Sequence, residues 1–419
     1  MTLWSLAAAA AAQPFDVETA TRLYLETLQG PARARSDAYF EGGYWLILWN
    51  GLVGALVNYL LLRTRWSAAW ARWAERRTRR RALQTMLYAI PFVLVTALLS
   101  LPWTIYVDYV REAKYGLMNQ SFAGWGGEQA IALLVSLVTT ALILAAVMAV
   151  IRRAPRTWWL WGSAVMMGFA AVGLLVTPVF VAPLFNHYTP MAEGPLREQI
   201  LAMAHANRIP ADNVYVVDAS RQSKRISANV SGIGPTIRIS LNDNLLNRTP
   251  PQDVKAVMGH EMGHYVLGHI PVLILEFGAG TLVLLFILSR AVPRILARSG
   301  ARWGIEGPAD VAAVPLYAAL VALLIIPATP LLNSMTRIEE AQADRFGLDA
   351  AREPDGFADV AMRLSEYRKI APTPLEELLF FDHPSGRTRV RGAMAWKARH
   401  LAELPPGQRT MVRPAPVTP

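Results

Sequence analysis

Six long apolar stretches dominate the chain, and each is about as long as an α-helix that crosses a bilayer, roughly 20 residues. They lie at residues 44–62, 85–107, 130–151, 158–182, 270–288 and 311–332. Buried helices of a soluble core would instead show apolar runs of about 10–14 residues broken by charges. Five of the six stretches contain no charged residue. The pattern predicts a membrane protein with about six transmembrane helices.

The exception is Glu276 in the fifth stretch, which follows His269 by two helical turns and points to nearly the same side of the helix. Carboxylates inside membranes generally face a protein interior or a wet cavity. Two interpretations remain open, because Glu276 could face such an interior or lie close to the membrane interface.

The rest of the chain divides around these stretches. The apolar run at 3–12 is too short to span a membrane and resembles a signal-peptide core, but no basic residue precedes it. A cleaved signal and an uncleaved, partly inserted start therefore both remain open, and residues 13–43 favour a short amphipathic helix. Our division is an N-terminal segment 1–43, four transmembrane helices in 44–182, a polar region 183–269, two transmembrane helices in 270–332, a helical region 333–404 and a Pro-rich disordered tail 405–419.

Composition narrows the class further. The chain is 53% hydrophobic and only 17% charged, against about a quarter charged in ordinary soluble domains. This composition disfavours a purely soluble protein and excludes a disordered one. Cysteine is absent, which excludes disulfides, thiolate metal clusters and a cysteine nucleophile.

The net charge of +10 comes from arginines in alternate short loops. Fifteen arginines lie in 63–81, 152–156 and 290–302, whereas the intervening loop 108–129 has two basic residues. Loops rich in Lys and Arg stay in the cytoplasm, so 183–269 and 333–419 are predicted to be extracytoplasmic. The chain has no RNA-binding or helix-turn-helix pattern, and we expect no nucleic-acid partner.

The segment that carries chemistry is an H-E-x-x-H motif at residues 260–264. His260 and His264 share one helix face, so both imidazoles can reach one metal ion, and Glu261 lies where it can accept a proton from water. The region also contains apparent strands at 214–217 and 236–241, joined by a Gly-rich turn. The alternative is a pair of ordinary histidines on a structural helix.

A catalytic zinc ion usually has three protein ligands, so a third must come from elsewhere. Glu340 and Asp344 are four residues apart after the sixth apolar stretch. Glu340 could bind the metal while Asp344 orients a ligand imidazole. Glu339 is the rival ligand, but no acidic residue follows it at the same spacing.

With these motifs, the chain resembles the CAAX prenyl protease 1 family of integral-membrane zinc metalloendopeptidases, as a bacterial-type member. The resemblance covers roughly residues 85–395. It rests on the motifs above and on Leu101-Pro102-Trp103, Ala182-Pro183-Leu184-Phe185-Asn186, Asn229, Leu267-Gly268-His269 and His383-Pro384 with Arg389.

The resemblance implies a fold and a metal cofactor. The fold is a mainly α, polytopic helical bundle with a zincin-like α+β catalytic region that carries a small β-sheet. One Zn²⁺ per chain would be held by His260, His264 and Glu340, with Glu261 as catalytic base and Asp344 behind the ligands.

The resemblance also implies roles for residues around the metal. His383 and Asn229 would grip the substrate backbone or stabilise the oxyanion, and Arg389 would support them. His269 would be structural or lie behind the ligands.

The chain departs from the family pattern in three places. It has Asn229-Val230-Ser231 where the family usually has Asn-Ala-aromatic, Thr336-Arg337 where Ser-Arg is usual, and one membrane span fewer than eukaryotic members. The family's site faces the cytosol, in conflict with the arginine count.

The predicted function is metal-dependent hydrolysis of peptide bonds in a peptide or protein substrate, lipidated or membrane-embedded, of the CAAX-processing type. The alternatives are a quality-control protease of the same chemistry and a non-catalytic membrane scaffold. All the residues that the chemistry needs are intact, which disfavours the scaffold.

Overall fold

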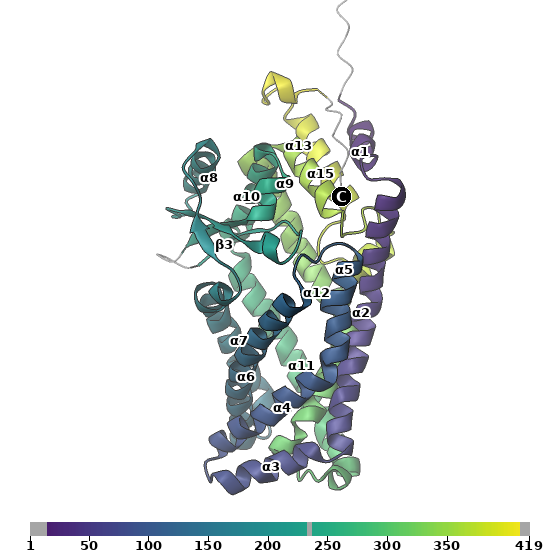
Figure 1. Cartoon of the computed structure of the whole chain (residues 1–419), viewed down its shortest axis with the longest axis vertical. Coiled ribbons are helices and arrows are strands. Elements are labelled where there is room, and N and C mark those ends of the chain that lie inside the picture. Colours follow the sequence, from purple (N-terminus) through teal and green to yellow (C-terminus); the bar gives the residue numbers. More distant parts are fainter. Residues whose placement is uncertain (1–14, 233–236, 411–419) are drawn as a thin grey trace, which may run out of the picture.

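The computed structural model describes residues 15–232 and 237–410, so the signal-like run at 3–12, most of the Gly-rich turn and the tail from 411 lie outside the described residues. The described chain forms an elongated bundle of long helices with a mixed α and β region at one end (Figure 1). We call this end the catalytic end. It holds the strands, both polar regions and the N-terminal helix α1 (Val17–Leu25).

Six helices are long and apolar enough to cross a membrane, as the sequence predicts. They contain α2 (Gly30–Arg63), α4 (Arg81–Thr104), α6 (Phe122–Arg153), α7 (Trp158–Val176), α11 (His269–Trp303) and α12 (Val314–Ala351). Several continue well beyond the apolar stretches, because hydropathy marks only the lipid-facing part of a helix. π-Helical turns extend α4 through Ile105–Val110 into α5 (Arg111–Lys114), and α7 through Thr177–Val181 into a 3₁₀ turn, Ala182–Leu184. Helix α12 runs without interruption from its membrane part into the catalytic end.

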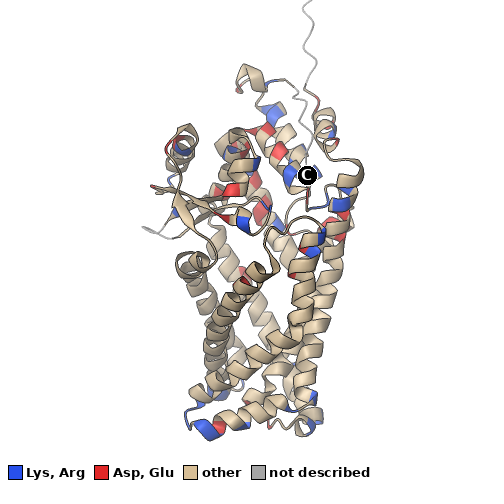
Figure 2. Cartoon of the chain, in the orientation of Figure 1, with Lys and Arg blue, Asp and Glu red and all other residues tan. Residues whose placement is uncertain are grey.

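The three arginine-rich loops meet at the opposite end of the bundle. The Arg65 side chain donates a hydrogen bond to the Arg302 carbonyl (2.8 Å), and Arg152 donates to the Ala309 carbonyl (3.3 Å). The amphipathic helix α3 (Trp66–Arg77) closes this end over buried side chains such as Tyr88 and Trp158. Figure 2 shows basic residues gathered here, whereas acidic and basic residues mix at the catalytic end.

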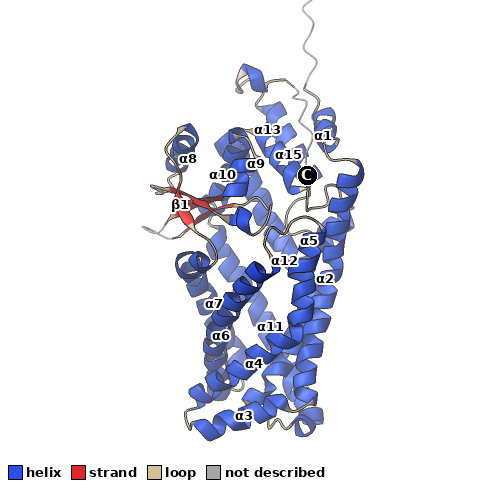
Figure 3. Ribbon diagram, viewed as in Figure 1, coloured by secondary structure: helices blue, strands red, loops and turns tan. Residues whose placement is uncertain are grey.

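A four-stranded sheet lies at the catalytic end, in the order β1-β2-β4-β3 (Figure 3). Its strands are β1 (Tyr188–Pro190), β2 (Val214–Val217), β3 (Ala228–Ser231) and β4 (Arg238–Asn242). The central pair β2 and β4 is parallel, and both outer strands are antiparallel to their neighbours. Strand β3 is therefore an edge strand, and no strand of the described residues pairs with its outer side. The small mixed sheet in a helical bundle confirms the predicted fold class.

Helices α8 (Pro195–Ala206) and α10 (Pro251–Val266) pack against this sheet. Ile239 and Leu241 of β4 are fully buried there beside Met258 and Met262 of α10. Ser240 and Asn242, which point to the other face, are buried too, so both faces of this strand are covered. The short helix α9 (Asp243–Arg248) leads from β4 to α10. The sheet thus fixes the helix that carries the H-E-x-x-H motif.

The C-terminal region adds α13 (Pro354–Leu364), α14 (Pro374–Phe380) and α15 (Gly386–Arg399). Helix α1 packs on this group, with the Tyr24 hydroxyl donating to the Asp355 carboxylate (2.9 Å). The Lys397 ammonium donates to the same carboxylate (2.6 Å) and to the Thr410 carbonyl (3.0 Å). The Pro-rich segment predicted to be disordered therefore begins with packed residues, including a 3₁₀ turn at Pro406–Gln408.

Candidate metal centre

Helix α10 supplies the first two residues of the centre. It begins at Pro251, where the missing N–H of proline costs no helical hydrogen bond. His260 and His264 lie one turn apart, with their Nε2 atoms 3.2 Å from each other. His260 is buried and His264 is half-buried. The two rings therefore present nitrogen atoms to one point, as the four-residue spacing predicts.

Helix α12 supplies the third residue. Glu340 Oε2 lies 3.2 Å from His260 Nε2, and Oε1 lies 3.4 Å from His264 Nε2. Within residues 15–232 and 237–410, His260, His264 and Glu340 form a group whose ligand atoms all lie within 4.8 Å of one another. The neighbouring Glu339 does not belong to it. The structure thus brings together the three residues predicted as ligands, from two helices separated by α11.

Glycines let α10 and α12 approach closely at this point. A Cβ atom added to Gly347 would lie 2.7 Å from the His260 backbone nitrogen, and one added to Gly259 would lie 2.8 Å from the Gly347 carbonyl oxygen. Gly263 faces the backbone of Ala343 in the same way. Side chains at these positions would hold the helices apart, so the glycines set the distance between Glu340 and the histidines.

Asp344 and Arg389 orient the imidazole ring of His260. Asp344 Oδ1 lies 2.8 Å from His260 Nδ1, which places the proton on Nδ1 and leaves the Nε2 lone pair for a metal. The buried Arg389 guanidinium donates from Nε to Asp344 Oδ2 (3.0 Å). Arg389, which the resemblance places in support of the substrate-binding groups, is therefore bound to Asp344, although it also lines the adjacent cavity.

His269 and Gln342 orient the imidazole ring of His264. His269 Nε2 lies 3.1 Å from Gln342 Oε1, and an amide oxygen can only accept, so this nitrogen carries the proton. His269 Nδ1 is then an acceptor, and it lies 2.9 Å from His264 Nδ1. His264 must donate from Nδ1, which leaves its Nε2 lone pair for a metal. His269 thus orients His264, a candidate metal ligand.

We expect Gln342→Leu to weaken zinc binding about 10-fold, because the loss of the acceptor frees His269 and then His264 to adopt the other tautomer. Competition with a chromogenic chelator on the purified protein measures this. Gln199→Leu, at an exposed position of α8, is the matched control and should keep the wild-type affinity. Equal affinities in all three proteins would contradict the hydrogen-bond chain.

The surroundings also set the protonation of these side chains. Burial lowers the pKa of His264 to about 4, so this ring is neutral at pH 7. Burial disfavours the charged form of His260 too, but the adjacent carboxylates of Asp344 and Glu340 outweigh it and raise its pKa to about 10. Metal binding must therefore displace a proton from His260. Burial raises the pKa of the Glu261 carboxyl to about 7.

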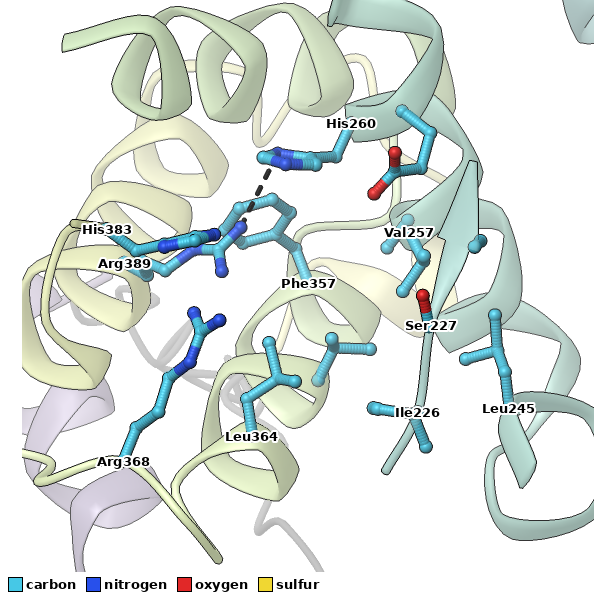
Figure 4. A pocket seen from close by; sticks show the side chains of 14 residues that line it. Ile226, Ser227, Leu245, Val257, His260, Phe357, Leu364, Arg368, His383 and Arg389 are labelled. Atoms are coloured by element: carbon cyan, nitrogen blue, oxygen red, sulfur yellow. Dashed lines mark hydrogen bonds between the residues drawn. The ribbon is translucent and has the colours of Figure 1, made fainter. Parts of the chain in front are cut away.

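A cavity of about 190 Å³ opens beside the centre. His260, Glu261, His383 and Arg389 line its polar part, and Leu245, Val257, Phe357, Val360 and Leu364 line its apolar part. Figure 4 shows His260 and Arg368 on opposite sides of this cavity. Residues 226–228, which lead into and begin the edge strand β3, form part of the wall. The cavity thus connects the candidate metal centre with a free sheet edge.

The two remaining candidate residues take different positions. His383, in the loop before α15, has Nε2 3.3 Å from Glu340 Oε2 and Nδ1 2.9 Å from Asp382 Oδ1. Asn229 is exposed on β3, opposite Ser240 of β4, and is not among the residues that line the cavity. The structure therefore brings His383 to the centre and leaves Asn229 beside it on the sheet edge.

The membrane carboxylate Glu276 also has a defined position. It is half-buried near Glu339 of α12. This favours the interior position, one of the two that the sequence leaves open.

The residues present fit a zinc ion. Two imidazole nitrogens and one carboxylate oxygen are the donor set of a common class of catalytic zinc sites. Glu340 Oε2 is buried, and the nitrogen atoms beside it are His260 Nε2 (3.2 Å) and His383 Nε2 (3.3 Å). With the His260 proton on Nδ1, this oxygen receives no hydrogen bond from His260, a costly arrangement unless a cation binds there. Both rings offer Nε2 to the same point, as the hydrogen bonds of Asp344 and His269 require.

Comparison with known families agrees with this geometry. Residues 190–397 match the model of peptidase family M48, and residues 28–187 match the model described as the CAAX prenyl protease N-terminal region with five membrane helices. This chain belongs to the CAAX prenyl protease family. Within residues 28–187, the described structure has four helices long and apolar enough to span a membrane, in α2, α4, α6 and α7. The family region is thus present with one membrane helix fewer than its description.

Members of the family with and without a solved structure resemble this chain. The Bacillus subtilis protein named uncharacterized metalloprotease YhfN is 29% identical over 77% of this chain and 76% of its own length. A CAAX prenyl protease 1 homolog of Arabidopsis thaliana is 27% identical over 74% and 73%. The crystal structure of S. mikatae Ste24p has a TM-score of 0.70 at 18% identity and covers 90% of this chain and 96% of that one. The fold is therefore that of Ste24p. The matches to the two family models show that the chain is a membrane metallopeptidase.

Sequence reasoning missed two polar residues near the centre, Gln342 and Arg368. Gln342 lies between Glu340 and Asp344, and its helical position relative to His269 depends on how α11 and α12 cross. Arg368 lies in the loop after α13, where nothing in the sequence distinguishes it from other arginines. Only the folded chain relates them to the site.

Proposed function

We propose that the chain is a zinc-dependent endopeptidase that hydrolyses peptide bonds at the membrane surface, with Glu261 as the base. The observation that carries the proposal is the convergence of His260, His264 and Glu340 beside Glu261 and a cavity that reaches a free sheet edge. A scaffold without catalysis would not need the hydrogen bonds that orient both rings.

When bound, the zinc ion would acidify a water molecule and polarise the scissile carbonyl. The residues of the chain perform the other steps. Glu261 accepts the proton of the attacking water and passes it to the leaving amine as the C–N bond breaks. His383, oriented through Nδ1 by Asp382, can donate from Nε2 to the carbonyl oxygen as negative charge develops there. Asp344 and Arg389 keep His260 in place throughout.

The substrate in this proposal is an extended peptide. Strand β3 has an unpaired edge beside the cavity, and a peptide can add to such an edge as a further strand, read through its main chain. The names of the relatives point to processing of prenylated proteins, and we extend this substrate class to the present chain. Clearance of damaged membrane proteins uses the same chemistry and is the alternative.

The test uses the full-length protein purified in detergent. We expect one zinc ion per chain and cleavage of an internally quenched peptide or casein that a chelator abolishes and zinc restores. Cleavage that persists unchanged without metal would refute the metal-dependent mechanism.

We further propose that the catalytic end faces the extracytoplasmic side. The three arginine-rich loops lie together at the other end of the bundle (Figure 2), and loops of this kind stay in the cytoplasm. A reporter enzyme that works only outside the cytoplasm should be active when it is fused after Pro419, and one that works only in the cytoplasm should be inactive there. Activity of a cytoplasmic reporter at the same position would overturn this orientation.

A further inference from the structure

The end of the bundle opposite the catalytic end carries fifteen arginines without carboxylate partners. They lie in the segments 63–81, 152–156 and 290–302, and we call this end the arginine end. None of them forms an ion pair within the part of the chain that the structure describes. At the catalytic end, by contrast, Arg248 and Arg352 pair with glutamates at 2.7 Å and 2.6 Å. The charge of the arginine end therefore needs anions from another molecule.

Rotation of the side chains cannot supply these partners. In and beside the three segments, the sequence has three acidic residues, Glu75, Glu306 and Asp310. The Asp310 carboxylate already accepts hydrogen bonds from two backbone amides, at 2.9 Å and 3.1 Å. Arg81 and Arg152 lie close enough together for their like charges to interact, and such charges repel each other unless an anion lies between them.

Tryptophans place the arginine end at the depth of the lipid headgroups. Trp66, Trp70 and Trp73 lie along one side of α3, and residues 158–161 at the start of α7 include three more. Trp66 and Trp161 are 47% and 57% exposed. Tryptophan is enriched where the membrane meets water, with its ring at the level of the headgroups. Figure 1 shows α3 lying across the end of the bundle, as expected for a helix in the plane of this interface.

Helix α3 holds its arginines away from the protein. Ser67 and Ala74 are buried against the bundle. Arg72 and Arg76 lie on the opposite side of the helix and are exposed. The Ser67 hydroxyl donates to the Ala312 carbonyl (2.8 Å), just before α12, and α3 also packs along α4. An anion bound by these arginines would therefore hold a helix that is fixed to two membrane helices.

We propose that the arginine end binds anionic phospholipids, whose phosphates lie between the guanidinium groups of 63–81 and 152–156. The tryptophans bring the arginines to the depth at which lipid phosphates lie, and a guanidinium binds a phosphate through two parallel hydrogen bonds. A phosphate between Arg81 and Arg152 would also remove the repulsion between them. Clusters of basic residues beside membrane helices recognise anionic lipids in this way. This binding is a property of the folded protein and does not depend on the proposed peptidase function.

The test uses the full-length protein purified in a neutral detergent, with phosphatidylglycerol or phosphatidylcholine added. Phosphatidylglycerol should raise the melting temperature about 3–5 °C above the value with phosphatidylcholine, because α3 connects the bound lipid to α4 and α12. Native mass spectrometry gives the apparent Kd for each lipid. Arg72→Gln, Arg76→Gln and Arg81→Gln combined should weaken the binding of phosphatidylglycerol about 10- to 100-fold. In phosphatidylcholine this variant should melt at the wild-type temperature, since all three side chains are exposed.

The matched control removes the same charge from exposed positions of the catalytic end. Arg208→Gln, Arg345→Gln and Arg399→Gln combined should keep the wild-type affinity for phosphatidylglycerol. An equal loss in this control would show that only net charge matters and would overturn the site.

The wild-type protein alone also decides the inference, so it does not depend on the folding of any variant. Equal melting temperatures with the two lipids would overturn the proposal. An equal gain from inorganic phosphate or a short RNA would overturn phospholipid as the partner. None of these measurements uses peptide cleavage, so the proposed peptidase function stands or falls separately.

Discussion

Replacement of Glu261 by glutamine is expected to lower kcat by about 10²- to 10⁴-fold while one zinc ion per chain remains bound. The amide has nearly the size of the carboxylate but cannot accept the proton of the attacking water. Glu261 lines the cavity beside His260 but does not belong to the group of three possible ligands. Loss of the base should therefore leave the metal in place. Zinc content by elemental analysis and kcat with a quenched peptide measure the two effects separately.

The matched control is Glu339→Gln. Glu339 is also a buried acidic residue close to the centre, but it lies outside the ligand group. The Glu339→Gln protein should bind one zinc ion per chain and keep an activity within a few-fold of the wild type. A Glu261→Gln protein with wild-type kcat would show that another group accepts the proton, and the proposed mechanism would be wrong.

The second large effect is expected from a single methyl group. Gly347→Ala places a Cβ atom 2.7 Å from the His260 backbone nitrogen and 2.9 Å from its Cα. Backbone atoms cannot rotate away as a flexible side chain can, so α10 and α12 must separate. Overpacking of this kind costs about 1–3 kcal/mol. The separation also moves Glu340 away from both rings, so we expect lower thermal stability together with weaker zinc binding, by about 10-fold or more.

Gly392→Ala tests whether a methyl group alone has this effect. Gly392 lies in α15, and a Cβ atom there would meet nothing within 4 Å. Alanine favours a helix over glycine by about 1 kcal/mol, so this variant should be at least as stable as the wild type and should bind zinc normally. Normal zinc affinity in Gly347→Ala would show that the crossing distance of the two helices does not control the centre.

The sequence predicts the residues of the candidate metal centre better than the residues that surround it. The candidate ligands follow from spacings within one helix, whereas the surrounding contacts depend on how distant parts of the chain pack. The spacing of His260 and His264 is a property of one helix, and so is the spacing of Glu340 and Asp344 that favours Glu340 over Glu339. That the two helices meet follows only from the need for a third ligand and from the family resemblance. The hydrogen bonds of Gln342 and the position of Arg368 depend on the packing of several elements, and no local pattern encodes such packing.

The secondary structure, too, is predicted where a local pattern determines it and missed where packing between distant segments does. Strand β2 lies where its run of Val and Tyr predicts it, and β4 lies within two residues of its predicted start. The sequence predicts helix in 13–43 and in 333–404 but not that α2 and α12 each continue from an apolar stretch into these polar parts. An apolar stretch shows where lipid contacts a helix and not where the helix ends. Helix α1 joins the C-terminal helices through a contact between Tyr24 and Asp355, a pair far apart in the sequence.

The uninterrupted course of α12 links the enzyme to its lipid surroundings. The same helix is embedded in the bilayer along its first part and carries Glu340 and Asp344 along its last part. A change in the tilt of that helix, as bilayer thickness or detergent micelle size changes, would displace the Glu340 carboxylate relative to the imidazoles of His260 and His264, which lie on α10 against the sheet. We therefore expect the geometry of the metal-binding pocket, and with it metal occupancy, to depend on the host lipid as well as on the protein.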